Sequence, residues 1–365
     1  MKYYLIAGEK SGDLHAANLI KAIQKKDPNA QFRAFGGDKM QAAGAEIVQH
    51  YDQMAFMGFL EVLKNFWLIR SFLNKCKQDI LSFQPDVVIL VDYAGFNMRI
   101  AHFAKKNSIK TFYYISPKIW AWNQSRAKKI RRDVDKMFVI LPFEKDFYKK
   151  FAYQVDYVGN PIFDEIANFS PNPNFFEQHQ IRKPIVAVLA GSRRAEIKYM
   201  LPEMIKVARH FEDYEFVIAA VNNMPESEYA LAKEAGFKII YEQTYDLLAV
   251  SRAALVTSGT ATLETALFEV PQIVCYKLEN WQYQLGKMLI KVPFISLVNL
   301  IAGKEVVKEL IQNQLHTANL VKELKAILNE KRPRILGDYK QLKEQIRTES
   351  ASKTAADLMW KYLNE

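Results

Sequence analysis

Apolar and polar positions alternate along the chain in blocks, each a short apolar run followed by a stretch with helical spacing. Near-continuous apolar runs are typical of parallel strands that are buried on both faces. The first series of runs lies at residues 2–7, 85–92, 111–116 and 136–141. The second series lies at residues 185–190, 215–220, 238–241, 254–257 and 272–276. The pattern predicts an α/β protein with two Rossmann-like, doubly wound sheets.

The alternation is interrupted between residues 160 and 184, where prolines and asparagines come close together. Such clusters mark loops, so this segment is the best position for a linker. A length of 365 residues also favours more than one domain. We predict a first domain over residues 1–165, a second over 166–335, a cleft between them, and a helical tail over 336–365.

The most informative loop is Ser258-Gly259-Thr260, which follows the apolar run 253–256 and precedes a helical stretch. The first amides of a helix have no partner within the helix, and the helix dipole is positive there, so such a turn suits phosphate oxygens. Glu264 lies about one turn further on, where its carboxylate can accept hydrogen bonds from the hydroxyls of a ribose. Together these features predict a nucleoside diphosphate site. A capped helix with a solvated acid is the structural alternative.

A second loop, Gly191-Ser192-Arg193, also joins a predicted strand to a predicted helix. Glycine lets the backbone approach a ligand closely, and a guanidinium can form two parallel hydrogen bonds to diphosphate oxygens. The alternative is that Arg193 or Arg194 pairs with Glu196 on the surface. Taken with the first loop, this loop favours a diphosphate site in the second domain.

Two loops of the first domain carry carboxylates just after predicted strands. The earlier loop contains Glu9, Ser11, Gly12 and Asp13, and it matches neither a P-loop nor the Gly-x-Gly-x-x-Gly fingerprint. Asp13 can cap the helix that begins there, which leaves Glu9 without a structural role. Asp92 ends a buried strand, and ligands of doubly wound sheets bind beyond the carboxyl ends of strands. A carboxylate there can take a proton from an attacking hydroxyl; a cap of the next loop is the alternative.

Large apolar side chains crowd residues 59–73 over more of the helix circumference than a single buried face needs. Arg70, Lys75 and Lys77 flank them. This combination favours an interfacial helix on an anionic membrane, or a groove for acyl chains, whereas a helix buried on two sides is the alternative. The candidate lipid-side residues are Met57, Phe66, Trp67 and Ile69.

The excess positive charge lies in the first domain. Residues 1–160 hold 25 lysines and arginines against 15 aspartates and glutamates, and the whole chain has a formal net charge of +10. Anionic lipid and phosphorylated small molecules are therefore candidate partners, and a solvated basic face is the alternative. We expect no nucleic-acid partner, because no recognisable nucleic-acid reading module accompanies the basic residues.

Cys76 and Cys275 are far apart and the six histidines do not cluster, so we expect no disulfide framework, no metal site and no cofactor. Free cysteines suit a reducing cytoplasm. The N-terminal residues become charged too soon for a signal peptide, and no apolar run reaches the length of a membrane span. We expect a cytoplasmic protein that does not cross a membrane.

Eight segments of the chain, in order, resemble the motifs of lipid-A-disaccharide synthases. They are residues 8–15, 57–63, 114–122, 141–144, 158–161, 191–193, 258–264 and 297–300. Some positions depart from the family pattern, namely Lys10, Gly95, Asn160 and Ala190, where Ala, Asp, His and Pro are common. The Gly95 departure matters most, because an acid at that position would compete with Asp92 for the role of base.

The resemblance implies an inverting GT-B glycosyltransferase that needs no metal. Such enzymes join UDP-2,3-diacylglucosamine to 2,3-diacylglucosamine 1-phosphate (lipid X), giving a β-1,6-linked lipid A disaccharide 1-phosphate and UDP. They work on the cytoplasmic face of the inner membrane of Gram-negative bacteria. The resemblance therefore implies a peripheral protein on an anionic membrane surface.

The resemblance also implies residue roles. Asp92 would activate the 6-hydroxyl of the acceptor, with Glu9 as the other candidate base, and Arg193 would stabilise the leaving diphosphate. The residues expected to line the UDP site are Gly191, Ser192, Arg193, Ser258, Gly259, Thr260, Glu264 and Asn299. The acceptor is expected beside Ser11, Gly12, Asp13 and the lipid-side residues.

Other interpretations stay open on the sequence. A UDP-N-acetylglucosamine epimerase or a murein glycosyltransferase would share the donor chemistry, but has less need of the apolar residues 59–73. A non-catalytic peripheral membrane protein would bind a UDP-sugar without turnover. A homodimer is also left open.

Overall fold

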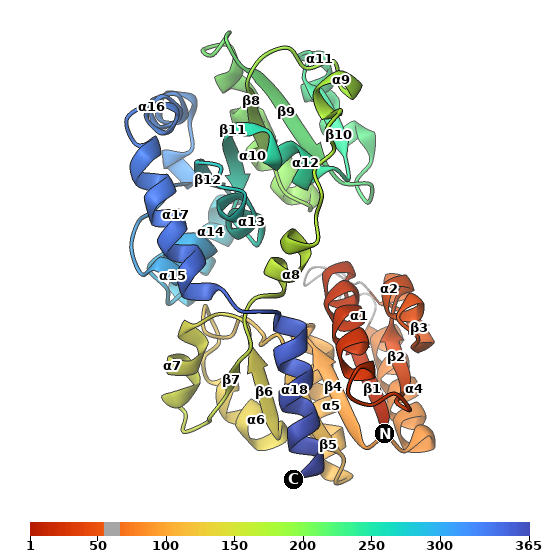
Figure 1. Ribbon diagram of the computed structural model, residues 1–365. Coiled ribbons are helices and arrows are strands. Elements are labelled where there is room, and N and C mark those ends of the chain that lie inside the picture. Colours follow the sequence, from red (N-terminus) through yellow and green to blue (C-terminus); the bar gives the residue numbers. More distant parts are fainter. Residues whose placement is uncertain (55–65) are drawn as a thin grey trace. The chain divides into compact units, whose positions relative to one another are not determined.

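The computed structural model describes residues 1–54 and 66–365, and the chain divides into two compact units (Figure 1). The N domain comprises Met1–Asp164 and Ile346–Glu365. The C domain comprises Glu165–Gln345. Each domain holds one parallel sheet covered by helices, which confirms the prediction of two Rossmann-like α/β domains.

The sheet of the N domain has seven parallel strands in the order β3-β2-β1-β4-β5-β6-β7. Their bounds are β1 Lys2–Ala7, β2 Gln31–Gly36, β3 Glu46–His50, β4 Val87–Val91, β5 Lys110–Tyr114, β6 Lys136–Val139 and β7 Asp156–Tyr157. The helices of this domain are α1 Lys10–Gln24, α2 Asp38–Ala42, α4 Phe66–Phe83, α5 Ala94–Lys106, α6 Arg126–Asp133, α7 Phe143–Lys149 and α18 Ala351–Asn364, with α8 Pro161–Ala167 at the boundary and a 3-10 turn at Tyr51–Gln53. Every residue of β4 is buried, as its unbroken apolar run predicts.

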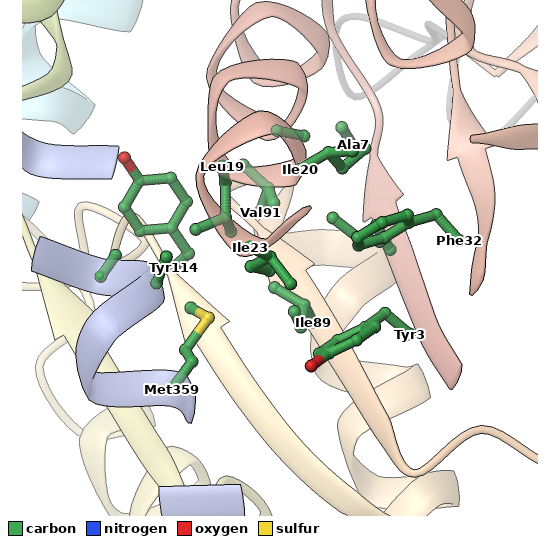
Figure 2. Close-up of a cluster of buried hydrophobic side chains, with 14 of the residues drawn as sticks. Tyr3, Ala7, Leu19, Ile20, Ile23, Phe32, Ile89, Val91, Tyr114 and Met359 are labelled. Carbon is green, nitrogen blue, oxygen red and sulfur yellow. The ribbon is translucent and has the colours of Figure 1, made fainter. Parts of the chain in front are cut away.

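The core of the N domain unites the first strand with the last helix. Figure 2 shows Tyr3, Leu19, Ile89 and Met359 among its buried side chains. Helix α18 packs beside α1, and Met359 on α18 is fully buried in this core. The tail expected as one separate segment is therefore divided, because α17 (Arg332–Ile346) lies mainly in the C domain and α18 completes the N domain.

The sheet of the C domain has six parallel strands in the order β10-β9-β8-β11-β12-β13. Their bounds are β8 Ile185–Leu189, β9 Glu215–Ala220, β10 Lys238–Tyr241, β11 Ser251–Thr257, β12 Gln272–Tyr276 and β13 Lys308–Ile311. The remaining helices are α9 Phe175–Gln178, α10 Arg194–Ala208, α11 Ala230–Glu234, α12 Thr244–Ala249, α13 Ala261–Leu267, α14 Asn280–Leu289, α15 Leu297–Ala302 and α16 Thr317–Leu328, with 3-10 turns at Glu226–Tyr229 and Gln312–Gln314. Apolar side chains that include Phe175, Ile185, Val217 and Val256 form the core of this domain.

Each sheet has one point where the strand order reverses direction. In the N domain this switch point lies between β1 and β4, and in the C domain it lies between β8 and β11. Ligands of doubly wound sheets bind beyond the carboxyl ends of the strands at such points. The loops after these four strands are therefore where a ligand site is expected.

Within the described residues, no helix is both long enough and apolar enough to cross a membrane.

Candidate active site

The two predicted phosphate loops of the C domain follow adjacent strands. Leu189 at the end of β8 pairs with Val256 near the end of β11. The loop Gly191-Ser192-Arg193 therefore lies beside the loop that begins at Ser258. The structure thus brings both loops to the switch point of this sheet, as a diphosphate site requires.

Gly191 cannot be replaced without a change in its loop. Its φ of +113° is unfavourable for other residues, and a Cβ on it would lie 2.5 Å from the Oε2 atom of Glu196. The same Oε2 atom accepts a hydrogen bond from the backbone N–H of Ser192 at 3.0 Å. Glu196, in the first turn of α10, thereby holds the loop in a tight curve.

Arg193 pairs with Glu196 on the surface, as the structural alternative expected, whereas Arg194, the first residue of α10, pairs with Glu228. The Nη1 atom of Arg193 lies 3.3 Å from the Oε1 atom of Glu196, and the Nε atom of Arg194 lies 2.6 Å from the Oε1 atom of Glu228. The side chain of Arg193 is 60% exposed, and an exposed ion pair contributes little free energy. Diphosphate oxygens can therefore compete with Glu196 for Arg193 at small cost.

The second phosphate loop offers unused donors. The hydroxyl of Ser258 donates to the carbonyl of Ile295 at 2.8 Å, which ties the loop to the segment before α15. The hydroxyl of Thr257 is buried and has no hydrogen-bond partner in the described part of the chain. Within the same described residues, the backbone N–H groups of Gly259 and Thr260 also have no acceptor. Unpaired donors of this kind at a helix start are what an anion satisfies. Thr257 was not among the residues expected to line the UDP site, although it directly precedes Ser258.

Glu264 is held in place by a tyrosine. The carboxylate lies half-buried in the first turn of α13, and its Oε1 atom accepts a hydrogen bond from the hydroxyl of Tyr245 at 3.3 Å. The same hydroxyl lies 3.4 Å from the Oε2 atom of Glu165. Tyr245 therefore fixes the carboxylate one turn beyond the phosphate loop, at the position expected for a ribose acceptor.

Asn299 has a structural role that the sequence did not predict. Its Nδ2 atom donates to the carbonyl of Val307 and to Glu309, both at 2.9 Å, and its Oδ1 atom accepts from the N–H groups of Val306 and Val307 at 2.8 and 3.0 Å. The side chain is fully buried, so a direct bond to UDP would require these bonds to break. Asn299 instead fixes the segment between α15 and β13.

Backbone strain marks the ends of two neighbouring strands in the N domain. Asp92 and Tyr93, which follow β4, have φ angles of +45° and +44°, and Ile115, which follows β5, has a φ of +66°. Left-handed conformations are unfavourable for residues with a Cβ, most of all for a β-branched one, and they cluster at functional sites. The strain lies where the sequence places the candidate base.

The surroundings of Asp92 fix its backbone and alter its acidity. Its carbonyl accepts a hydrogen bond from the Nδ2 atom of Asn97 at 2.8 Å and another from the hydroxyl of Tyr113. Burial raises the pKa of the Asp92 carboxyl, while Lys118, the backbone N–H of Tyr93 and His15 each oppose this rise. A carboxylate with a raised pKa is a better proton acceptor than an ordinary aspartate.

Gly8 and Glu9 follow the strand next to β4. A Cβ on Gly8 would lie 2.3 Å from the ring of Tyr93, so only glycine fits there without displacing that ring. Glu9 precedes α1 and acts on Tyr93, whose pKa is raised first by burial and then by the charge of Glu9. The structure thus brings the loops of both candidate bases to one switch point, with Tyr93 between them.

Asp13 caps a helix, but not the helix in which it lies. Its two carboxylate oxygens accept hydrogen bonds from the N–H groups of Gly37, Lys39 and Met40 at 2.8, 3.0 and 3.2 Å. These groups lie at the start of α2, so the expectation of a cap on α1 is corrected. Asp13 is buried and Ser11 is exposed, while a Cβ on Gly12 would lie 3.4 Å from the Cβ of Ala7.

Comparison with known proteins decides the family. The family model described as lipid-A-disaccharide synthetase matches residues 3–360 of this chain. The chain belongs to the lipid-A-disaccharide synthase family. A lipid-A-disaccharide synthase of Syntrophus aciditrophicus (strain SB) is 38% identical over 364 residues, which cover 96% of this chain and 95% of that relative.

Solved structures share the fold at low sequence identity. The UDP-GlcNAc 2-epimerase of Neisseria meningitidis bound to UDP-GlcNAc has a TM-score of 0.68 at 15% identity and covers 99% of this chain and 100% of its own. The calicheamicin glycosyltransferase CalG4 has a TM-score of 0.65 at 15% identity and covers 100% of this chain and 98% of its own. These likenesses concern the fold alone. Membership of the lipid-A-disaccharide synthase family makes the protein a glycosyltransferase of lipid A biosynthesis with a GT-B fold.

Two segments that resemble lipid-A-disaccharide synthase motifs hold residues that the sequence did not single out. Glu144, on α7, is buried and accepts hydrogen bonds from the N–H groups of Ile140 and Leu141 at 3.2 and 2.9 Å. Burial raises the pKa of Glu144 to about 7, although these backbone bonds and the side chains of Ser116 and Trp120 oppose the rise. The only sequence signal for these residues was the motif match itself.

The structure describes the apolar segment 59–73 only from residue 66 onward. Met57 and the apolar positions 59–63 lie outside the described residues, as does the side chain of Phe66. Trp67 is 73% exposed, Ile69 is half-buried, and Leu73 is buried. The described part of α4 is therefore not buried on two sides.

The basic side chains of α4 interact with neighbouring side chains. Arg70 lies over the ring of Trp67 at 5.8 Å, and Lys77 lies over the ring of Phe103 at 5.6 Å. Lys75 donates to Gln49 at 2.8 Å. A hollow of ≈ 410 Å³ on this surface is lined by Trp67, Arg70, Ser71, Asn74, Lys75 and Gln78.

In the described part of the chain, no three histidine, cysteine, aspartate or glutamate side chains cluster in a way that could hold a metal ion.

Proposed function

We propose that the protein transfers 2,3-diacylglucosamine from UDP-2,3-diacylglucosamine to the 6-hydroxyl of 2,3-diacylglucosamine 1-phosphate. The transfer inverts the anomeric carbon and gives the β-1,6-linked disaccharide 1-phosphate and UDP. One observation carries the proposal: the loops that hold the candidate catalytic and diphosphate-binding residues follow β1 and β4 in the N domain and β8 and β11 in the C domain, the strands at the two switch points.

The C domain would hold the donor. Arg193 would leave its exposed pair with Glu196 and bind the diphosphate, and the N–H groups of Gly259 and Thr260 would bind the same oxygens. These fixed donors would stabilise the negative charge that develops on UDP as the glycosidic bond breaks, so the site would not depend on a metal ion. Glu264, oriented by Tyr245, would accept hydrogen bonds from the ribose.

The N domain would hold the acceptor and the base. The carboxylate of Asp92 would take the proton of the 6-hydroxyl as its oxygen attacks the anomeric carbon from the face opposite UDP. The raised pKa of Asp92 supports this assignment, because the basicity of a carboxylate rises with its pKa. Glu9 on the adjacent loop is the competing candidate.

The substrates carry acyl chains, so the protein would work as a peripheral protein on the cytoplasmic face of the inner membrane. The exposed Trp67 and Arg70 of α4 support this, since an aromatic ring beside a cation suits the interface of an anionic bilayer. A second basic surface supports it as well, where a hollow of ≈ 530 Å³ is lined by Lys128, Arg131, Arg132, Lys150, Phe151 and Ala152.

The test is to incubate the purified protein with both acylated glucosamine substrates in detergent micelles and to look for product by mass spectrometry. The expected result is the disaccharide 1-phosphate, together with one equivalent of UDP. Binding of UDP without disaccharide would support a non-catalytic UDP-sugar-binding protein instead. Conversion of UDP-N-acetylglucosamine to its C2 epimer would identify an epimerase.

A further inference from the structure

The loop between β5 and α6, residues 115–125, begins directly beside Asp92. Val91 at the end of β4 pairs with Tyr114 at the end of β5, and the N–H of Asp92 donates to the carbonyl of Tyr114 at 3.2 Å. This loop therefore belongs to the same edge of the sheet as the candidate base. It contains most of the motif at residues 114–122, to which no role has been assigned above.

Buried side chains anchor this loop to the N domain. The hydroxyls of Ser116 and Tyr148 lie 2.7 Å apart, and the ring of Trp120 packs edge-on against Phe143 at 5.0 Å between centroids. Ser116, Ile119 and Trp120 are all buried. A loop anchored at three buried positions has little freedom to move, so its exposed side chains start from fixed points.

Lys118 is the exposed cation of this rigid loop. Its neighbours Pro117 and Ile119 are both buried, whereas Lys118 itself is exposed. Among the residues that the structure describes, no carboxylate or other partner lies within hydrogen-bond or ion-pair distance of its ammonium. Its charge nevertheless reaches Asp92, because Lys118 is the largest influence that lowers the pKa of that carboxyl.

An unpaired ammonium at the edge of a site suits an anionic substituent of a ligand, since lysine is a compact point charge that binds phosphate well. On the reaction proposed above, the acceptor sugar carries two groups that must be told apart. Its 6-hydroxyl, which C6 carries on ring carbon C5, must face the base. Its phosphate is on C1, the other carbon bonded to the ring oxygen, so the ring oxygen separates the two groups. A cation near Asp92, but not paired with it, matches this separation.

We propose that Lys118 binds the phosphate of the acceptor sugar and thereby selects which hydroxyl of that sugar faces Asp92. This inference rests on the proposed function, and it adds a specificity residue to it. The rigid support from Ser116 and Trp120 has a purpose on this proposal, because a charge orients a bound sugar only if its own position is fixed.

The experiment compares two acceptors, 2,3-diacylglucosamine with and without its 1-phosphate, at saturating UDP-sugar. The variants are Lys118→Ala and Lys118→Arg, with Lys129→Ala as a control, because Lys129 is an exposed lysine without a partner within the described residues. The kcat/KM ratio between the phosphorylated and unphosphorylated acceptor measures the phosphate contact. We expect Lys118→Ala to lower this ratio by roughly tenfold to a hundredfold, the scale of one charge-assisted contact, chiefly through KM. Lys118→Arg should keep most of the preference, and Lys129→Ala all of it.

Other outcomes would overturn the proposal. An unchanged acceptor preference in Lys118→Ala, with a lower rate on both acceptors, would show a purely structural role. An unchanged preference with the acid limb of the pH profile moved to higher pH would show that Lys118 acts on Asp92 alone. If the wild-type protein makes no disaccharide from either acceptor, the proposed function itself fails, which is a different result from either of these.

Discussion

The ring of Tyr93 occupies the space that a side chain on Gly8 would need, with 2.3 Å between its ring atoms and the position of a Cβ. Tyr93 follows Asp92 directly, and both have left-handed φ angles. The contact therefore couples the loop after β1 to the strained backbone that carries the candidate base.

Gly8→Ala should displace Tyr93 and with it Asp92. We expect turnover to fall on the order of a hundredfold, because a shift of about 1 Å in a catalytic group can cost that much. Overpacking should lower the free energy of unfolding by about 1–3 kcal/mol. Gly95→Ala is the matched control, since a Cβ on Gly95 meets nothing within 4 Å. Equal activity in the two variants would show that the Gly8 contact does not matter for catalysis.

Asp92→Asn keeps the shape of the side chain and removes its basicity. Turnover should fall by roughly a hundredfold or more while UDP binding stays intact. The pKa of Asp92 is raised, so the carboxyl holds its proton to a higher pH than an ordinary aspartate. The kcat/KM of the wild type should therefore rise with pH through this raised pKa and level off above it. Near-normal turnover in Asp92→Asn, combined with loss of activity in Glu9→Gln, would assign the base to Glu9.

Arg193→Ala should remove a charge-assisted contact to the leaving diphosphate. We expect a loss on the order of 2–4 kcal/mol of transition-state stabilisation, seen in kcat/KM. Arg194→Ala is the control, because Arg194 is also exposed, at 78% against 60% for Arg193, but pairs with Glu228 and not with Glu196. A similar loss in both variants would point to a general effect of charge, and no loss in Arg193→Ala would remove Arg193 from the site.

Replacement of Trp67 and Leu68 by serine should weaken binding to vesicles that contain anionic lipid. Both side chains are exposed on α4, so the melting temperature should change little. Leu73→Ser is the control, because Leu73 is buried and its loss should destabilise the N domain by about 2–5 kcal/mol. Co-sedimentation and melting temperature are measured together. Unchanged vesicle binding in the double variant would show that α4 is not the membrane-facing surface.

Glu144→Gln should change how stability depends on pH. The folded-state pKa of about 7 lies above the ordinary value of 4.5, so the folded protein binds this proton more tightly than the unfolded chain does. The resulting stabilisation is complete below pH 4.5 and is lost as pH rises to about 7, a total on the order of 3 kcal/mol. The difference in melting temperature, Glu144→Gln minus wild type, should therefore be more positive at pH 8 than at pH 5. The exposed Asp146→Asn on the same helix should show no such difference.

The sequence predicted the fold because each central strand contains an unbroken apolar run. The run at Val87–Val91 is buried at every position, as a strand covered on both faces must be. The loops after such strands could be located for the same reason. Ser258 and Gly191 were placed correctly at strand ends, and the strand order then brought them together.

The functions of single polar residues were harder to predict, because they depend on partners far along the chain. Asp13 binds backbone groups that begin at Gly37, and Asn299 is fully satisfied by the segment around Val307. Neither partner is visible from the local motif. Lys118 was missed for a related reason, since its proximity to Asp92 arises from the pairing of β4 with β5.

The packing of α18 beside α1 separates the order of synthesis from the order of folding. A ribosome releases β1 and α1 before the C domain, but Ala355 and Met359, which close their core, are made only after it. The C domain has all of its strands by Ile311, so it can fold while the N domain still has apolar surface on α1 uncovered. Helix α1 is therefore made before the C domain but covered only after it, and its apolar surface needs protection from aggregation until α18 has been made.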